Sequence, residues 1–256
     1  MSKLTELGFK GDIRFIHNEE GSGARYYKSS VYYPDSLTDP VTNSGITIDP
    51  GVDLANANKR LIDTVLNIYA SADLLTAFQL TVLRDAVGLK KYDAIDWLLA
   101  NRTLFKNKFF VPPYVALDVM ENYTAVPYWK AIAEKMPELL KIKNEVIALA
   151  VHTSLLSMAY NRGHKRTIKD VADYVSVRNW DGLAKKISRV HHAMKALRDR
   201  RKREAKLIEE ALEKKNNFTI ELTDINPAPL TVIPVSETEL VIEKLNYKVK
   251  RPEINE

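Results

Sequence analysis

The spacing of hydrophobic residues changes part-way along the chain. From about residue 57 to residue 203, apolar side chains recur every three or four positions, as at Leu61, Val65 and Ile68. This spacing is typical of helices with one buried face. Residues 145–160 are apolar on nearly every side, which predicts a helix surrounded by other helices. We therefore predict an α+β fold that is mainly α, with this helix in its interior.

The first 55 residues have a different pattern. They contain six of the nine glycines and three prolines, residues that favour turns and loops. We expect a short helix around residues 13–18, followed by a loop-rich region with extended pieces at 30–33 and 45–48. This part is expected to form a small loop-and-hairpin lobe beside a helical lobe.

Three short motifs predict helix ends within the helical part. Gly163 predicts the end of the apolar helix. Thr167 and Asp170 have capping-box spacing, with Asp in place of the preferred Glu or Gln, and predict the start of the next helix. Residues 179–181, Asn-Trp-Asp, predict a further start.

The C-terminal region differs from the rest. A charged helix is expected to end near residue 215, and short strands broken by Pro227, Pro229 and Pro234 are expected to follow it. A segment of this size is too short to bury much surface alone. We therefore divide the chain into a domain over residues 1–203 and an arm over residues 204–256 that docks on the domain or on a partner.

Composition removes several classes of function. The chain has no cysteine, which excludes disulfides and thiolate metal sites. None of its five histidines belongs to an H-E-x-x-H pattern, so a zinc peptidase is not expected. We expect no cofactor. No run approaches the roughly 18 apolar residues of a membrane helix. Residues 1–8 lack the apolar core of a secretory signal, so we expect no membrane span and delivery by another route.

The net charge of +5 favours polyanionic partners such as nucleic acid, anionic membranes or the bacterial envelope. Residues 185–206 contain ten lysines and arginines but only two acidic residues, Asp199 and Glu204. This stretch is either a solvated helix face or a surface that attracts anionic wall polymers. No recognition motif accompanies it, so specific nucleic-acid binding is not expected.

Two carboxylates in the first 55 residues have the arrangement that glycoside hydrolysis needs, namely an acid for the leaving oxygen and a second group that activates water. Glu20 stands at the expected end of the first helix, directly before a glycine, with Glu19 as a competing neighbour. Thr47 and Asp53 stand on either side of a turn. The alternative roles are ordinary ones: a surface carboxylate for Glu20, a strand residue for Thr47, and a helix cap for Asp53.

These segments resemble a known family. Phage-type lysozymes have a Glu-Gly at the end of their first helix and a later Thr-Ile-Gly strand, and their pesticin-like branch has a Ser-Gly-x-Thr-Ile-Gly-x-Gly-x-Asp-Leu segment. Residues 20–21 and 44–54 are similar to these two motifs. Residues 157–163, Ser-Met-Ala-Tyr-Asn-Arg-Gly, and residues 179–184 resemble two later stretches of the same enzymes. The likeness extends over about residues 12–195.

The resemblance implies hydrolysis of the bond between N-acetylmuramic acid and N-acetylglucosamine in bacterial peptidoglycan, without a cofactor. Glu20 would be the general acid, and Asp53 and Thr47 would place the hydrolytic water. An inverting outcome is expected if the two carboxyl groups lie about 6.5–9.5 Å apart, and a retaining one near 5 Å. Substrate contacts are expected from three adjacent residues at the end of the apolar helix: Tyr160, Asn161 and Arg162.

One position departs from the family pattern. Asp49, followed by Pro50, stands where the family has glycine, and it adds a third carboxylate near the expected site. The alternative function is therefore a catalytically inactive lysozyme-like subunit of a phage virion or contractile tail. The expected location is a phage particle or injection system acting in the bacterial periplasm and cell wall, with particle proteins as partners of residues 204–256.

Overall fold

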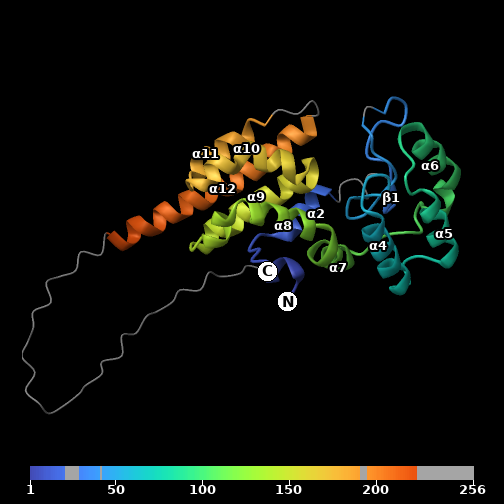
Figure 1. The fold of residues 1–256 in the computed structure, drawn as a ribbon, viewed down its shortest axis with the longest axis horizontal. Helices are drawn as coiled ribbons and strands as arrows, with labels where there is room; N and C mark the ends of the chain where they lie inside the picture. The colour runs from blue at the N-terminus through green and yellow to red at the C-terminus, as the bar shows by residue number, and fades with distance from the viewer. Residues whose placement is uncertain (21–28, 41, 191–194, 224–256) are drawn as a thin grey trace, which may run out of the picture.

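The structure is a computed structural model that describes residues 1–20, 29–40, 42–190 and 195–223. It is mainly helical and contains one small antiparallel sheet, which confirms the predicted fold class. Figure 1 shows the sheet and the helices that follow it at one end of the molecule, and α8–α12 at the other end.

The N-terminal half contains two short helices, the sheet and then helices α4–α7. The sheet has the order β1-β2-β3, and both neighbouring pairs are antiparallel. The bounds are α1 Lys3–Glu6, α2 Ile13–Glu20, β1 Val31–Tyr32, β2 Thr47–Ile48, β3 Val52–Asp53, α4 Lys59–Ser71, α5 Ala77–Asp85, α6 Lys91–Phe105 and α7 Pro113–Val119.

The C-terminal half consists of helices that pack around α9. The bounds are the π-helical turn η1 Met120–Thr124, α8 Val126–Lys135, the 3-10 turn η2 Pro137–Lys141, α9 Glu145–Arg162, α10 His164–Ser176, α11 Trp180–Ser188 and α12 Lys195–Thr223. Among the described residues, no helix combines the length and the apolar character needed to cross a membrane.

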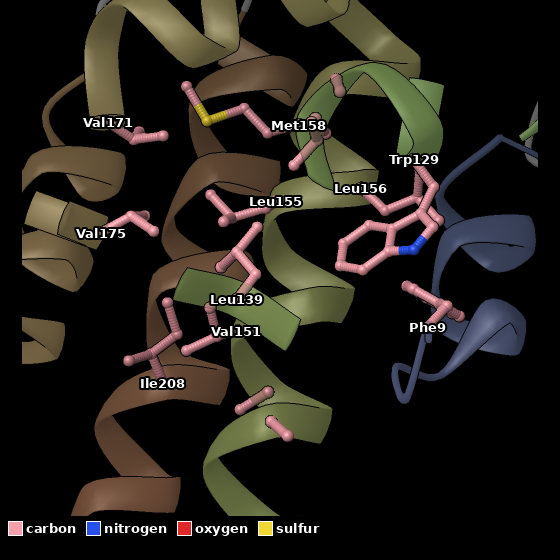
Figure 2. Packing of buried hydrophobic residues seen from close by; sticks show 14 of the residues in the cluster. Phe9, Trp129, Leu139, Val151, Leu155, Leu156, Met158, Val171, Val175 and Ile208 are labelled. Atoms are coloured by element: carbon pink, nitrogen blue, oxygen red, sulfur yellow. The ribbon is translucent and has the colours of Figure 1, made fainter. Parts of the chain in front are cut away.

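Two hydrophobic clusters hold these elements together. The larger one surrounds α9, whose Leu155 and Met158 pack with Trp129 of α8 and Ile208 of α12 (Figure 2). This places the apolar helix in the interior, as its sequence predicts. The second cluster joins the sheet to α4–α7, with Tyr69 among its fully buried side chains.

His152 packs against Phe9 and Trp129 of the first cluster and has a partner on each ring nitrogen. Its Nδ1 accepts a hydrogen bond from the Lys10 amide at 3.0 Å, and Nε2 lies 3.1 Å from the Leu139 carbonyl oxygen. This pattern requires the neutral ring with its proton on Nε2. Burial lowers the pKa of His152 to about 4, so the ring stays neutral near pH 7.

The helix ends after residue 160 agree with the sequence at two positions and differ at one. Helix α9 ends at Arg162, and Gly163 follows with φ of 88°. Asn179 caps α11, accepting a hydrogen bond from the Gly182 amide at 2.8 Å. The predicted start at Thr167 was wrong, because α10 begins at His164 and the Thr167 hydroxyl donates to the Gly163 carbonyl one turn back.

Helix α12 extends over the expected division of the chain between residues 203 and 204. It is one continuous helix, and Ala205, Ile208 and Ala211 are buried in the cluster around α9. The prediction that strands follow the helix from about residue 216 was wrong for residues 216–223, which are still part of α12. No proline interrupts the helix there, since the first proline of this region is Pro227. Residues 224–256 lie outside the described part of the chain.

Candidate active site

A cavity of about 340 Å³ lies where α2, the sheet, η1, α8 and α9 meet. Its size is at the small end of the usual range for ligand pockets, roughly 300–1,000 Å³. The cavity brings together Glu20, Thr47, Asp53, Tyr160 and Asn161, five of the six residues expected at the site. The other lining residues are Tyr32, Pro34, Ser44, Gly51, Val52, Asn56, Ala57, Leu61, Thr124 and Tyr128.

Glu20 is the last residue of α2 and faces the turn between β2 and β3. A methyl group added to Gly51 would lie 3.3 Å from Glu20 Oε2 and 3.4 Å from the Tyr160 ring. Gly51 also has φ of 92°, a conformation that side chains disfavour. Glycine at this position therefore lets the turn approach the Glu20 carboxylate closely.

Arg200 of α12 binds the other oxygen of Glu20. Its Nη1 donates to Glu20 Oε1 at 2.5 Å, and its side chain is only 3% exposed. Its Nη2 donates to the Ser157 carbonyl at 3.0 Å. Burial alone would lower the pKa of Arg200, but the negative charges of Glu20 and Glu204 outweigh burial and raise it. Arg200 therefore stays charged and fixes the orientation of Glu20.

The neighbouring Glu19 points to a different partner. Arg203 holds it with two hydrogen bonds, from Nε to Oε1 and from Nη2 to Oε2, each of 2.7 Å. Glu19 does not line the cavity. Of the two adjacent carboxylates, the cavity therefore contains only Glu20, as the following glycine suggested.

Asp53 is held by three hydrogen-bond donors. Its Oδ1 accepts from the amides of Gly45 at 3.1 Å and Ala55 at 2.9 Å, and Oδ2 accepts from Asn56 Nδ2 at 2.8 Å. The helix-cap alternative was wrong, because α4 begins later and Asn58 caps it. Asp53 instead stabilises the loop around β3 and still lines the cavity.

Thr47 lies directly opposite Asp53 in the antiparallel pair of β2 and β3. Side chains opposite each other in such a pair lie on the same face of the sheet, with Cβ atoms roughly 4.5–5.5 Å apart. The side chain of Thr47 is buried, and its hydroxyl lies 3.5 Å from the Gly45 carbonyl, at the limit of a hydrogen bond. Thr47 Oγ1 and the Asp53 carboxylate therefore form adjacent polar groups on the cavity wall.

Two tyrosines also line the cavity. The Tyr160 hydroxyl donates to the Pro50 carbonyl and accepts from the Thr124 hydroxyl, both at 2.9 Å. Its ring centroid lies 5.3 Å from that of Tyr128. Burial and the charges of Glu20 and Asp53 raise the pKa of Tyr128, which places this phenol within the field of both carboxylates.

The arrangement contains an acid, a second carboxylate with an adjacent hydroxyl, and aromatic rings that can pack against a sugar. Within the described ranges, no group of three or more histidine, aspartate and glutamate side chains could hold a metal ion. No protein-family model matches the chain, and no curated protein does.

Arg162 is the expected site residue that does not line the cavity. Its Nη1 donates to Asp170 Oδ2 at 2.5 Å, which connects α9 to α10. Asn161, the residue before it, does line the cavity and accepts from Arg201 Nη2 at 3.4 Å. Of the three consecutive residues at the end of α9, Tyr160 and Asn161 thus line the cavity, whereas Arg162 binds α10.

Asp49 is not one of the cavity-lining residues. Its side chain is buried, and its backbone carbonyl accepts a hydrogen bond from the Tyr69 hydroxyl at 2.5 Å. Burial and the charge of Asp49 raise the pKa of Tyr69 well above its usual value. The third carboxylate therefore belongs to the packing between the sheet and α4.

Four residues behind Glu20 were not predicted from the sequence as part of the site: Ser157, Arg200, Arg201 and Glu204. The two arginines and Glu204 lie in a stretch for which both a solvated face and a polymer-attracting surface were considered, but all three are buried. A signal was present in the spacing. The buried stripe of Ala211, Ile208 and Ala205, continued backwards at helical spacing, passes through Glu204 and then Arg200 and Arg201.

Proposed function

We propose that the chain is a muramidase that hydrolyses the β-1,4 bond between N-acetylmuramic acid and N-acetylglucosamine in peptidoglycan, with a two-lobed lysozyme-like fold. The single observation that carries the proposal is the shared cavity of Glu20, Thr47 and Asp53. The three residues belong to two separate motifs that resemble those of phage-type lysozymes. All three line the same cavity, which supports the proposal.

Glu20 is the proposed general acid. Arg200 occupies its Oε1, so Oε2 is the oxygen that can carry the proton toward the glycosidic oxygen. Proton transfer from Oε2 allows the bond between the anomeric carbon and that oxygen to break. Exclusion of Glu19 from the cavity supports the choice of Glu20 over its neighbour.

Asp53 and Thr47 are the proposed binding groups for the hydrolytic water. Asp53 Oδ2 accepts one hydrogen bond within the protein, from Asn56, so it retains a lone pair for a water molecule. The Thr47 hydroxyl beside it gives the water a second partner. The water oxygen adds to the anomeric carbon as its proton passes to Asp53. Tyr128, Tyr160 and Asn161 supply the remaining contacts to sugar.

The second candidate is a lysozyme-like subunit of a virion or contractile tail without catalytic activity. Its support is that Glu20 and Asp53 both have complete structural roles, in an ion pair with Arg200 and in the loop around β3. Both candidates are consistent with association with a phage particle or injection system, acting at the periplasm and cell wall.

Release of soluble muropeptides from purified peptidoglycan tests the proposal. We expect the wild type to release them with new reducing ends at N-acetylmuramic acid, and Glu20→Gln to lower the rate at least 100-fold, because the amide cannot donate the catalytic proton. Glu19→Gln is the matched control. It changes the adjacent carboxylate, which binds Arg203 outside the cavity, and should keep activity within about threefold, the cost of a partly exposed ion pair.

Absence of release by the well-folded wild type on several wall types would reject the muramidase and leave the structural subunit. Equal losses in the two glutamine variants would reject Glu20 as the acid. Equal activity of the wild type and both variants would show that neither glutamate at the end of α2 is a catalytic residue.

A further inference from the structure

A cluster of four charges lies behind the cavity and is almost inaccessible to water. The side chains of Arg200, Arg201 and Glu204 are each exposed by 3% or less, and Glu20 by 17%. The two arginines and Glu204 come from α12, and Glu20 comes from the end of α2. Isolated charges in such a place are strongly disfavoured, so their mutual compensation is a condition for folding.

Glu204 is the centre of this cluster. Its Oε1 accepts from the Ser157 hydroxyl at 2.6 Å and from Arg200 Nε at 3.2 Å, and it lies 2.9 Å from Arg201 Nη2. Burial raises the pKa of Glu204, although the two arginines act in the opposite direction. Burial lowers the pKa of Arg201 to about 10, which leaves it charged near neutral pH.

The charges of the cluster cancel. Two guanidinium groups balance two carboxylates when Glu20 is ionised. When Glu20 takes up a proton, one positive charge is left over beside it. Without the negative charge of Glu204, two would be left over, and a neutral Glu20 next to them would be far less favourable.

We propose that Glu204 is a positioning residue that makes Glu20 usable as an acid. It holds the Arg200 guanidinium from behind and cancels the charge of Arg201. Glu20 is thereby fixed by one arginine while it experiences little net positive charge. The catalytic meaning of this inference rests on the proposed function, but the electrostatic dependence of Glu20 on Glu204 does not.

Other charged and titratable groups face the cluster and remain constant in the experiment. The groups that interact directly with Glu20, Arg200 or Arg201 are Glu19 of α2, Tyr128 of α8, and Tyr160 and Arg162 of α9. Behind them lie Arg203 and Asp199 of α12, Asp170 of α10 and Asp53 of the sheet, which interact with Glu19, Arg203, Arg162 and Tyr128, respectively. None of them contacts Glu204 Oε1, so a change at residue 204 leaves these groups in place.

Glu204→Gln tests the proposal by removing the charge and keeping the shape. The amide oxygen can still accept from Ser157 and both arginines. We expect the alkaline limb of the pH profile of kcat to move down by roughly one pH unit, because a nearby charge changes proton affinity by about that much or more. At pH values on the alkaline limb, kcat of Glu204→Gln should be about tenfold lower than kcat of the wild type. KM should stay unchanged, because Glu204 does not line the cavity.

Two further variants separate charge from shape. Arg201→Met removes one positive charge and should move the alkaline limb to higher pH. The double variant Arg201→Met/Glu204→Gln restores the charge balance and should return the limb toward its wild-type position. If Glu204 had only a packing role, the double variant would be no closer to the wild type than the single ones. Glu210→Gln, which removes an exposed carboxylate from the same helix, is the matched control and should leave the profile unchanged.

A measurement without substrate keeps this inference distinct from the proposed function. The pH at which the Glu20 carboxyl group takes up its proton can be followed by carbon NMR in the wild type and each variant. Displacements in the stated directions support the inference even if no muropeptide is released, whereas unchanged midpoints in folded variants overturn it. If Glu204→Gln does not fold, the comparison of Arg201→Met with the double variant decides, since the latter has no unbalanced buried charge.

Discussion

Four polar side chains in the middle of α9 are deeply buried. His152, Thr153, Ser154 and Ser157 are each exposed by 2% or less. They form hydrogen bonds to other parts of the chain, such as that between the Asp12 amide and Thr153 Oγ1 at 2.6 Å. At the level of residues, the interior helix therefore supplies apolar packing and also hydrogen bonds that fix its neighbours in place.

His152 gives a prediction about stability and pH. Its pKa is about 4 in the folded chain and about 6.5 when exposed, so below pH 6.5 the unfolded chain binds a proton that the folded chain does not. Stability is therefore complete above pH 6.5 and is lost as pH falls toward 4. The loss due to this group approaches roughly 3 kcal/mol.

Urea denaturation at pH 7, 5.5 and 4.5 measures this loss. We expect His152→Gln to be less stable at pH 7 but to lack this component of the decline. His164→Gln, at a half-exposed position, should keep it. An identical decline in the wild type and His152→Gln would mean that His152 is not the responsible group.

At the level of elements, the hairpin of β2 and β3 depends on Asp53 for its shape. Asp53→Asn keeps an oxygen for the Gly45 and Ala55 amides but loses the acceptor for Asn56. Asp53→Ala loses all three hydrogen bonds. We expect the alanine variant to lower the free energy of unfolding by roughly 2–3 kcal/mol and the asparagine variant by about 1 kcal/mol.

Activity should respond differently from stability at this position. Both variants remove the proposed acceptor of the water proton, so both should release muropeptides at least 100-fold more slowly than the wild type. An Asp53→Asn variant with near wild-type activity would show that Asp53 has only its role in the hairpin. The two measurements together thus separate the loop contact from the chemistry.

Helix positions were predictable where a local signal acts alone. Asn179 can cap a helix by accepting one amide hydrogen bond within three residues, and it does so. Thr167 carries a similar local signal, but Gly163 lets the chain turn immediately after α9, so α10 begins earlier and Thr167 is inside it. Where two local signals compete, the tertiary position of the preceding helix decides.

The candidate site was partly predictable for a related reason. Glu20, Thr47 and Asp53 belong to short motifs that resemble those of a known family. Arg200, in contrast, contacts Glu20 although the two residues are 180 positions apart in the sequence. Composition made residues 185–206 look like a solvated surface. The buried face of α12 becomes predictable only when the apolar positions 205, 208 and 211 are extended at helical spacing to the charged residues 200–204.

At the scale of the whole molecule, α12 closes the cluster around α9 and also completes the surroundings of Glu20. A chain that ends at residue 203 would lose Glu204, Ala205, Ile208 and Ala211 together. Burial of a medium-sized apolar side chain contributes roughly 1.5–3 kcal/mol, and typical domains have only about 5–15 kcal/mol of stability. We expect this truncated chain to lose its cooperative thermal transition.

A chain that ends at Thr223 is the matched control, because it keeps the whole of α12. It should unfold cooperatively, as measured by calorimetry. A chain ending at residue 203 that unfolds as cooperatively as this control would show that the first 203 residues form a complete unit.

The long separation between Glu20 and Arg200 also matters for the order of synthesis. Glu20 leaves the ribosome early, with the sheet soon after it, whereas its guanidinium partner is made 180 residues later. Since translation adds about 5–20 residues per second, the carboxylate waits for roughly 10–40 seconds without that partner. The proposed acid therefore becomes ordered only when most of the chain exists, because the surroundings of Glu20 are incomplete until α12 has docked.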